Sequence, residues 1–245
     1  MRQLITILAA GILSTGAIHG QTGPAGHFHK VIVSPYIQAT FVQGDKESVA
    51  INHSMVDTNK LHVEVRGGVL RLYLDGAKNL PHDQRDGSDD NRQGHPLYPK
   101  HAIVATVVYK KLDALSLRGE ENILVQSPLS ARKFRLRAYG ETAVTFAEVH
   151  IDKMHSTIYG DCSVTIEAGV TNRQYFTSFG DGKINTTAIT GQKAKVTSFG
   201  DAEFRVNVSD LIKITSFGDA KVCYRGAPDI VKGIHFGGVD VQKLD

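Results

Sequence analysis

Acidic side chains recur at a regular interval in the second half of this 245-residue chain, each directly after a glycine. Carboxylates can act as general acids or bases, bind a cation such as Ca²⁺, or accept hydrogen bonds from the amides of a turn. An active site has to depart from a repeat, and this spacing matches no Ca²⁺-binding loop. We therefore expect no metal and no cofactor, with a bound cation as the alternative. The acids predicted to cap turns are Asp161, Asp181, Asp201 and Asp219.

An aromatic residue precedes most of the same glycines, and three of them lie in identical TSFGD segments, at 177–181, 197–201 and 215–219. Aromatic rings beside hydroxyl groups are typical of surfaces that bind sugars or proteins. The rings could instead stabilise the fold by stacking on one another, and the two roles are compatible. The predicted ligand-binding residues are Tyr139, Tyr159, Phe179, Phe199, Phe217, Thr177, Thr197 and Thr215.

The glycines themselves recur at a nearly constant interval and so define a repeat, and they are Gly119, Gly140, Gly160, Gly180, Gly200, Gly218 and Gly237. Four residues after each glycine the side chain is always apolar: Ile123, Val144, Val164, Ile184, Phe204, Val222 and Val241. The residue just before each of these is mostly polar. This alternation predicts a strand with one buried face after every glycine.

A single repeat of this size cannot bury its apolar face, but copies stacked in register can, with strands about 4.8 Å apart. We therefore predict an all-β fold over residues 111–245, a right-handed β-solenoid or β-helix-like stack whose rungs of about 20 residues turn at glycine corners. Equivalent side chains would then form rows along the molecule. An antiparallel sandwich of repeated hairpins is the alternative, but it does not explain why the same corner residues recur.

Residues 21–110 are expected to form an N-terminal β region that caps the first rung. LHVEV at 61–65 and LRLYL at 70–74 alternate, and the intervening RGG predicts a hairpin. The polar segment 76–100 is expected to be a mobile loop. AIVATVVY at 102–109 is a nearly continuous apolar run, which predicts a strand buried on both faces.

Residues 1–20 have the layout of a secretory signal peptide, because Arg2 precedes an apolar run that ends at Leu13. Cleavage is expected before Gln21 or, as second choice, after Ala17. The run is too short to span a membrane, and no later stretch is apolar enough. The protein is therefore expected to be exported to the periplasm, the outer membrane or the cell exterior.

The net charge of the chain is +3, and its Lys and Arg residues are scattered along the sequence, so no nucleic-acid partner is indicated.

Two cysteines, Cys162 and Cys223, lie three repeats apart in the predicted stack, which is too far for a disulfide. We predict two free thiols. Cys162 would lie in the core, and Cys223 would be outside, capped or exposed.

Lys183 and Lys221 flank Glu203 in equivalent positions, which predicts ion pairs between neighbouring strands.

The order of several segments resembles the head GIN domain family of putative auto-transporter adhesins, found in exported proteins of Bacteroidota. These segments are VIVSPYIQATFVQGD, VEVRGGVLRLYL, LDALSLRGEENI, the glycine–acid repeats and YRGAPDI. The resemblance covers residues 28–243 and implies a β-rich, solenoid-like fold. Family corners usually carry serine before the second glycine, where this chain has aromatic residues.

Together these features predict an exported, non-catalytic, adhesin-like module that binds a surface glycan or an envelope protein through its aromatic and threonine rows. An oligomer is compatible with the sequence. The alternatives are a polysaccharide-active β-helix enzyme and a purely structural envelope protein. Enzymes of that fold need clustered acids, bases or arginines that break the repeat, and no nucleophile motif, phosphate loop or zinc spacing is present.

Overall fold

The computed structural model describes residues 22–78 and 96–245. The predicted signal peptide and most of the predicted loop lie outside the described residues. The described strands form one 19-stranded sheet that coils on itself, with one short 3₁₀ turn, η1 (Thr58–Lys60). The strands are β1 (Thr22–Pro24), β2 (Lys30–Val33), β3 (Ile37–Gln43), β4 (Ser48–Ser54), β5 (Leu61–Arg66), β6 (Val69–Leu74), β7 (Ile103–Tyr109), β8 (Ala114–Gly119), β9 (Asn122–Val125), β10 (Leu129–Gly140), β11 (Ala143–Phe146), β12 (Val149–Gly160), β13 (Ser163–Ile166), β14 (Gly169–Phe179), β15 (Lys183–Phe199), β16 (Ala202–Phe217), β17 (Ala220–Arg225), β18 (Asp229–Phe236) and β19 (Val239–Lys243).

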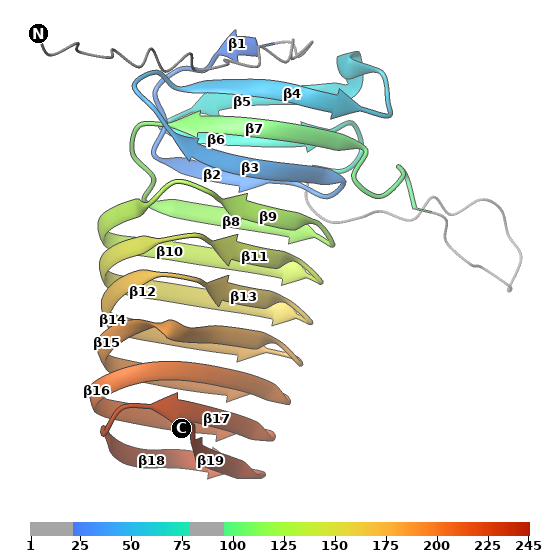
Figure 1. The fold of residues 1–245 in the computed structure, drawn as a ribbon. Helices are drawn as coiled ribbons and strands as arrows, with labels where there is room; N and C mark the ends of the chain where they lie inside the picture. The colour runs from blue at the N-terminus through green and yellow to red at the C-terminus, as the bar shows by residue number, and fades with distance from the viewer. Residues whose placement is uncertain (1–21, 79–95) are drawn as a thin grey trace, which may run out of the picture.

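The fold is a β-solenoid of about six turns, as predicted. Each rung pairs with the next through parallel strands in register, so that Leu136 lies opposite Ser156 and Ser156 opposite Phe176. Figure 1 shows the rungs from β8–β9 down to β18–β19 stacked one below another. Parallel pairing between successive repeats excludes the antiparallel sandwich.

The core runs through the centre of the stack and is made by the inward side of the predicted alternation. Val144, Val164, Ile184 and Phe204 occupy equivalent positions in successive rungs, and each is at most 1% exposed. Burial of one such side chain stabilises the fold by about 1.5–3 kcal/mol. The spacing of apolar residues in the sequence thus fixes which face of each strand points inward.

The glycine corners require glycine for two separate reasons. Gly160 has a φ of 91°, a region that other residues rarely adopt. A Cβ at this position would lie 2.5 Å from the carbonyl oxygen of Gly140 in the rung before. The backbone of each corner therefore packs directly on the corner of its neighbour.

The N-terminal half continues the same stack before it closes it. β2 pairs in parallel with both β6 and β8, and β3 with both β7 and β9. The rung β2–β3 therefore lies between β6–β7 and β8–β9, although it precedes both in the sequence (Figure 1). The antiparallel strands β1, β4 and β5 cover this end of the stack. The predicted hairpin is present as β5–β6, turning at Gly67 and Gly68, which both have positive φ.

Two expectations about this half need correction. Segment 76–100 is packed against the fold at its end, because the Tyr98 ring is 8% exposed and lies 5.6 Å from the Tyr36 ring. The Tyr98 hydroxyl also donates to the Asp75 carbonyl at 3.0 Å. Strand β7 is fully buried on one face only, since alternate side chains such as Val104 and Val108 are half-buried.

Both cysteines are free, as predicted. Cys162 is in the core, and burial raises the pKa of its thiol. Cys223 lies on the outward side of β17, yet it is only 2% exposed. Arg205 and Gln242 flank it in the neighbouring strands, so Cys223 is capped and not exposed.

Candidate functional site

One outer face of the solenoid gathers most of the predicted site residues. It is formed by the outward side chains of β2, β6, β8, β10, β12, β14, β18 and the C-terminal parts of β15 and β16, and we call it the ladder face. Because neighbouring strands are parallel and in register, equivalent residues of each repeat form straight rows across these strands. Three such rows carry the candidate chemistry.

The first row is a ladder of aromatic rings, as the repeat predicted. Its members are Tyr139, Tyr159, Phe179, Phe199, Phe217 and Phe236. Successive centroids are 4.7, 4.8, 4.8, 5.1 and 5.7 Å apart, and the first four pairs are within 5° of parallel. Each adjacent pair contributes about 0.5–1.5 kcal/mol beyond its burial. The ladder therefore stabilises the stack whatever else it does.

The ladder presents ring edges to solvent, because each ring face is covered by the next ring. Phe179, Phe199 and Phe217 are 37%, 38% and 40% exposed. A sugar that packs flat against an aromatic ring needs a free ring face, which the interior of this ladder does not offer. Ring edges carry the positive side of the aromatic quadrupole, so they attract oxygen atoms of a partner.

The second row consists of hydroxyl groups beside the ladder. Thr177, Thr197 and Thr215 lie opposite one another in β14, β15 and β16, and each is half-buried. Thr157 in β12 belongs to the same row, although it was not singled out in the sequence. The row gives the ladder face regularly spaced donors and acceptors, about 4.8 Å apart.

The acids lie at the corners, on the edge of the ladder face. The Asp219 carboxylate accepts a hydrogen bond from the Gly238 amide at 2.7 Å, and Asp201 accepts from the Asp219 amide at 3.3 Å. These two acids thus reach the next corner along the stack. Asp161 and Asp181 are exposed and make no hydrogen bond within the described part of the chain. Turn capping by the whole set stays a prediction.

A buried acid at the first corner was missed by the sequence reasoning. Glu121 is 4% exposed, and its carboxylate accepts from the amides of Tyr36 at 2.8 Å and Glu120 at 2.9 Å. Burial raises the pKa of Glu121, against the effect of these two hydrogen bonds. The signal was present, because the second acid of the RGEEN segment occupies an inward position of the alternation.

The third row brings together cations that are scattered in the sequence. Lys133, Lys153, Arg173 and Lys193 lie opposite one another in successive strands, and we call them the cation row. Each of them lies seven residues before a corner glycine, and this shared position is the signal in the sequence that could have identified the row. Beside them, burial and the charges of Lys133, Arg135 and Lys153 lower the pKa of His155. The ladder face is therefore electrostatically positive along the cation row.

The opposite outer face differs from the prediction in its ion pairing. Lys183, Glu203 and Lys221 are in register across three strands, but Glu203 pairs with Arg205 of its own strand, with 2.8 Å between Nε and Oε1. That hydrogen bond is the main reason why the pKa of Glu203 is lowered.

The described residues contain no group of three or more His, Cys, Asp and Glu side chains placed to share a metal ion. In the same part of the chain, no helix is long and apolar enough to cross a membrane.

Solved structures of similar fold include three proteins from Bacteroides and Parabacteroides species. A putative adhesin from Bacteroides fragilis has a TM-score of 0.76 at 16% identity, covering 92% of this chain and 96% of that chain. A putative lipid binding protein from Parabacteroides distasonis has a TM-score of 0.64 at 16% identity, covering 92% and 97%. A putative adhesin from Parabacteroides merdae has a TM-score of 0.62 at 15% identity, covering 94% and 98%. At these identities the likeness shows the fold.

The sequence itself matches no curated protein. It does match a family model, described as putative auto-transporter adhesin, head GIN domain, over residues 27–228. That span includes the N-terminal rungs, every glycine corner except the one at Gly237, and most of the aromatic ladder. The chain belongs to the head GIN domain family of putative auto-transporter adhesins.

Proposed function

We propose that this protein is an exported, non-catalytic, adhesin-like module that binds a surface glycan or an envelope protein through its ladder face. The observation that carries the proposal is the strip made by the exposed ring edges of the ladder and the adjoining threonine row. Such a strip offers an apolar surface together with regularly spaced hydroxyl groups. The family name supports a binding role of this kind.

The shape of the strip favours an extended partner. It is straight and repeats at the strand spacing of about 4.8 Å. The rings run across six strands, and the threonines across four of them. A polymer chain or an edge segment of another protein can contact several equivalent positions at once, which strengthens binding through multivalency. Because the ring edges attract oxygen atoms, partners rich in hydroxyl or carbonyl groups fit this strip best.

The threonine row can be tested without disturbing the ladder. The double substitution Thr177→Val and Thr197→Val removes two hydroxyl groups at nearly constant shape. We expect at least a tenfold loss of affinity for the best ligand from a glycan array or an envelope-extract pull-down, with an unchanged melting temperature. Thr165→Val on the opposite outer face is the matched control and should leave binding unchanged.

Three results would count against the proposal. If the double variant binds as well as the unaltered protein, the strip is not the binding surface. Turnover of acidic polysaccharides by the purified protein would instead support the enzyme alternative. If the protein binds nothing in either screen, the purely structural envelope role gains support.

A further inference from the structure

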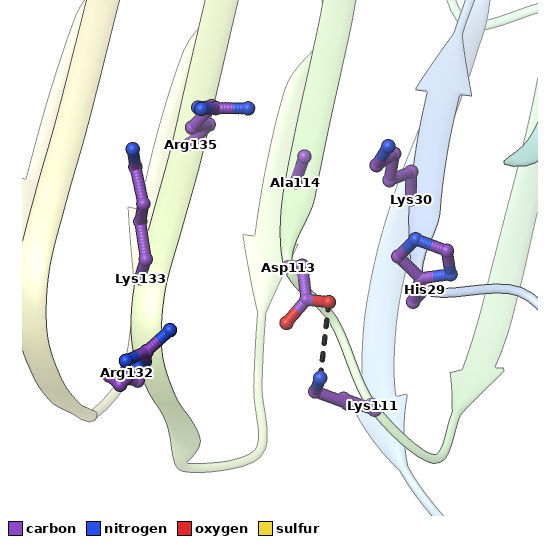
Figure 2. A pocket seen from close by; sticks show the side chains of 8 residues that line it. All are labelled: His29, Lys30, Lys111, Asp113, Ala114, Arg132, Lys133 and Arg135. Atoms are coloured by element: carbon purple, nitrogen blue, oxygen red, sulfur yellow. Dashed lines mark ion pairs between the residues drawn. The ribbon is translucent and has the colours of Figure 1, made fainter. Parts of the chain in front are cut away.

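A basic groove lies at the N-terminal end of the ladder face, where the solenoid rungs meet the strands of the N-terminal half. It consists of two adjoining hollows of about 380 and 220 Å³, which share Lys30, Ala114 and Arg135 among their lining residues. Figure 2 shows the larger hollow, with Ala114 between Arg135 and Lys30. It shares no residue with the aromatic ladder or the threonine row, although it adjoins them at Arg137, which lies opposite Thr157.

The groove exists because a strand with small outward side chains lies between strands with long ones. Ala114 of β8 is in register with Lys30 of β2 and Arg135 of β10. One step further along the strands, Ser116 lies opposite Arg137. The short side chains of β8 form the floor, and the long cationic side chains on both sides form the walls.

The charge of the groove is not balanced by the protein. Asp113 is the acid among the lining residues, and it is already paired with Lys111, with 3.2 Å between carboxylate oxygen and Nζ (Figure 2). The other cations of the walls form no ion pair within residues 22–78 and 96–245. They are Lys30, Arg71, Arg132, Lys133, Arg135 and Arg137. Like charges this close repel each other, so a bound anion would relieve the repulsion.

Arginine side chains select the kind of anion. The guanidinium group presents its N–H donors as a planar fork that matches carboxylate, sulfate and phosphate oxygens. Arg135 and Arg137 project from the same face of β10, about 6.6 Å apart along the strand. Two neighbouring forks of this kind suit two anionic groups on one ligand.

The cation row extends the site beyond the groove. Lys133 belongs to both, and Lys153, Arg173 and Lys193 follow at steps of about 4.8 Å. A single small anion would occupy only the groove, whereas a linear chain with repeated negative charges can occupy both. The continuity of groove and row thus favours a polymer.

Nucleic acid is also a linear polyanion, but the rings on this face do not suit it. Single-stranded nucleic acids bind by stacking bases on free aromatic faces. On the ladder face the rings stack on each other, including His155 on Tyr175 at 4.5 Å between centroids. The positive charge therefore lies beside rings that are already stacked on one another.

We propose that the basic groove and the cation row bind a linear anionic polysaccharide through its carboxylate or sulfate groups. This inference deepens the glycan-binding role proposed above, but it concerns different residues from the ladder and the threonine row. The two proposals can therefore fail separately.

The test uses residues 21–245, the chain without its predicted signal peptide. Four probes are compared: polygalacturonate, heparin, neutral dextran and single-stranded DNA. Calorimetry should show binding of polygalacturonate, heparin or both, weakening as salt rises, and no binding of dextran. The polygalacturonate and heparin arms distinguish carboxylate from sulfate recognition. The double variant Arg135→Gln and Arg137→Gln should bind the preferred polysaccharide at least tenfold more weakly.

The matched control carries the same change of charge on the opposite outer face. Lys183→Gln with Lys221→Gln should alter the affinity less than twofold. As a local readout, NMR should show that the bound polysaccharide raises the pKa of His155, because it offsets the charges of Lys133 and Arg135. Equal losses in both double variants, equally tight binding of DNA, or no binding of either polysaccharide would overturn the proposal.

Discussion

At the scale of single residues, Glu121 joins two rungs that are distant in the sequence. Its carboxylate holds the Tyr36 amide, 85 residues away, and the Glu120 amide at its own corner. Tyr36 has a φ of 70°, a strained value for a residue other than glycine. The buried carboxylate thus fixes the turn between β2 and β3 against the first glycine corner.

The substitution Glu121→Gln keeps the shape of this side chain but replaces one acceptor oxygen with a donor. One of the two backbone amides then loses its acceptor, and the free energy of unfolding should fall by about 1–3 kcal/mol. Glu120→Gln is the control, since Glu120 is exposed and pairs with Lys100 at the surface. That change should cost no more than about 1 kcal/mol. Urea unfolding of both variants measures the difference, and equal effects would contradict the assigned role.

At the scale of secondary-structure elements, each glycine corner is where one strand ends and the next begins. Gly140 and Gly160 illustrate how closely the corners pack, because a Cβ added at either would lie 2.5 Å from the carbonyl oxygen of the corner before it. The corner therefore fixes the distance between rungs, and the strands on either side follow it.

Gly160→Ala should destabilise the protein by more than about 2 kcal/mol. A positive φ alone costs an alanine about 1–2 kcal/mol, and the added Cβ would also lie 2.5 Å from a backbone oxygen. Gly67→Ala is the control, because Gly67 has a φ of 57° but nothing within 4 Å of an added Cβ. Thermal unfolding should show a clearly larger loss for Gly160→Ala. Similar losses would mean that corner packing contributes little.

The sequence predicts these elements well because the repeat and the alternation act together. Val164 and Phe204 are buried, and Phe199 is exposed, as their positions relative to the glycine require. Side chains that gather only after stacking were harder to recognise. Lys133 and Arg173 are two repeats apart in the chain, so their shared row appears only when every outward position is aligned to the glycines.

At the scale of the whole molecule, the spatial order of the rungs differs from their order in the chain. The parallel pairs of β2 and β3 with β8 and β9 join residues more than 80 positions apart. No local pattern of residues encodes that pairing, so the sequence predicted a cap where the structure also has two further rungs. The repeats from β8 to β19, in contrast, follow chain order and interact with their immediate neighbours.

Because of this simple order, one whole repeat should be removable. Deletion of residues 181–200 joins Gly180 to Asp201 and restores a complete corner. The shortened protein should fold with a β-type circular dichroism spectrum and lose about 1–3 kcal/mol of stability, the share of about 20 residues. Deletion of residues 181–190 removes half a rung and joins two segments that lie on the same face of the solenoid, so it should prevent folding. If the full-repeat deletion also fails to fold, stability does not divide among the repeats.

Because all rungs share one register, a repeat can be added during evolution without altering the other rungs. Duplication of one TSFGD repeat would add one ring, one threonine and one step of about 4.8 Å to the outer surface, while the fixed hollow beside β8 keeps its shape. If the ladder face binds polymers as proposed, long polymers would then be held at more points, and short oligosaccharides would be held as before. Repeat number is thus a means to adjust valency without redesigning the anchoring end.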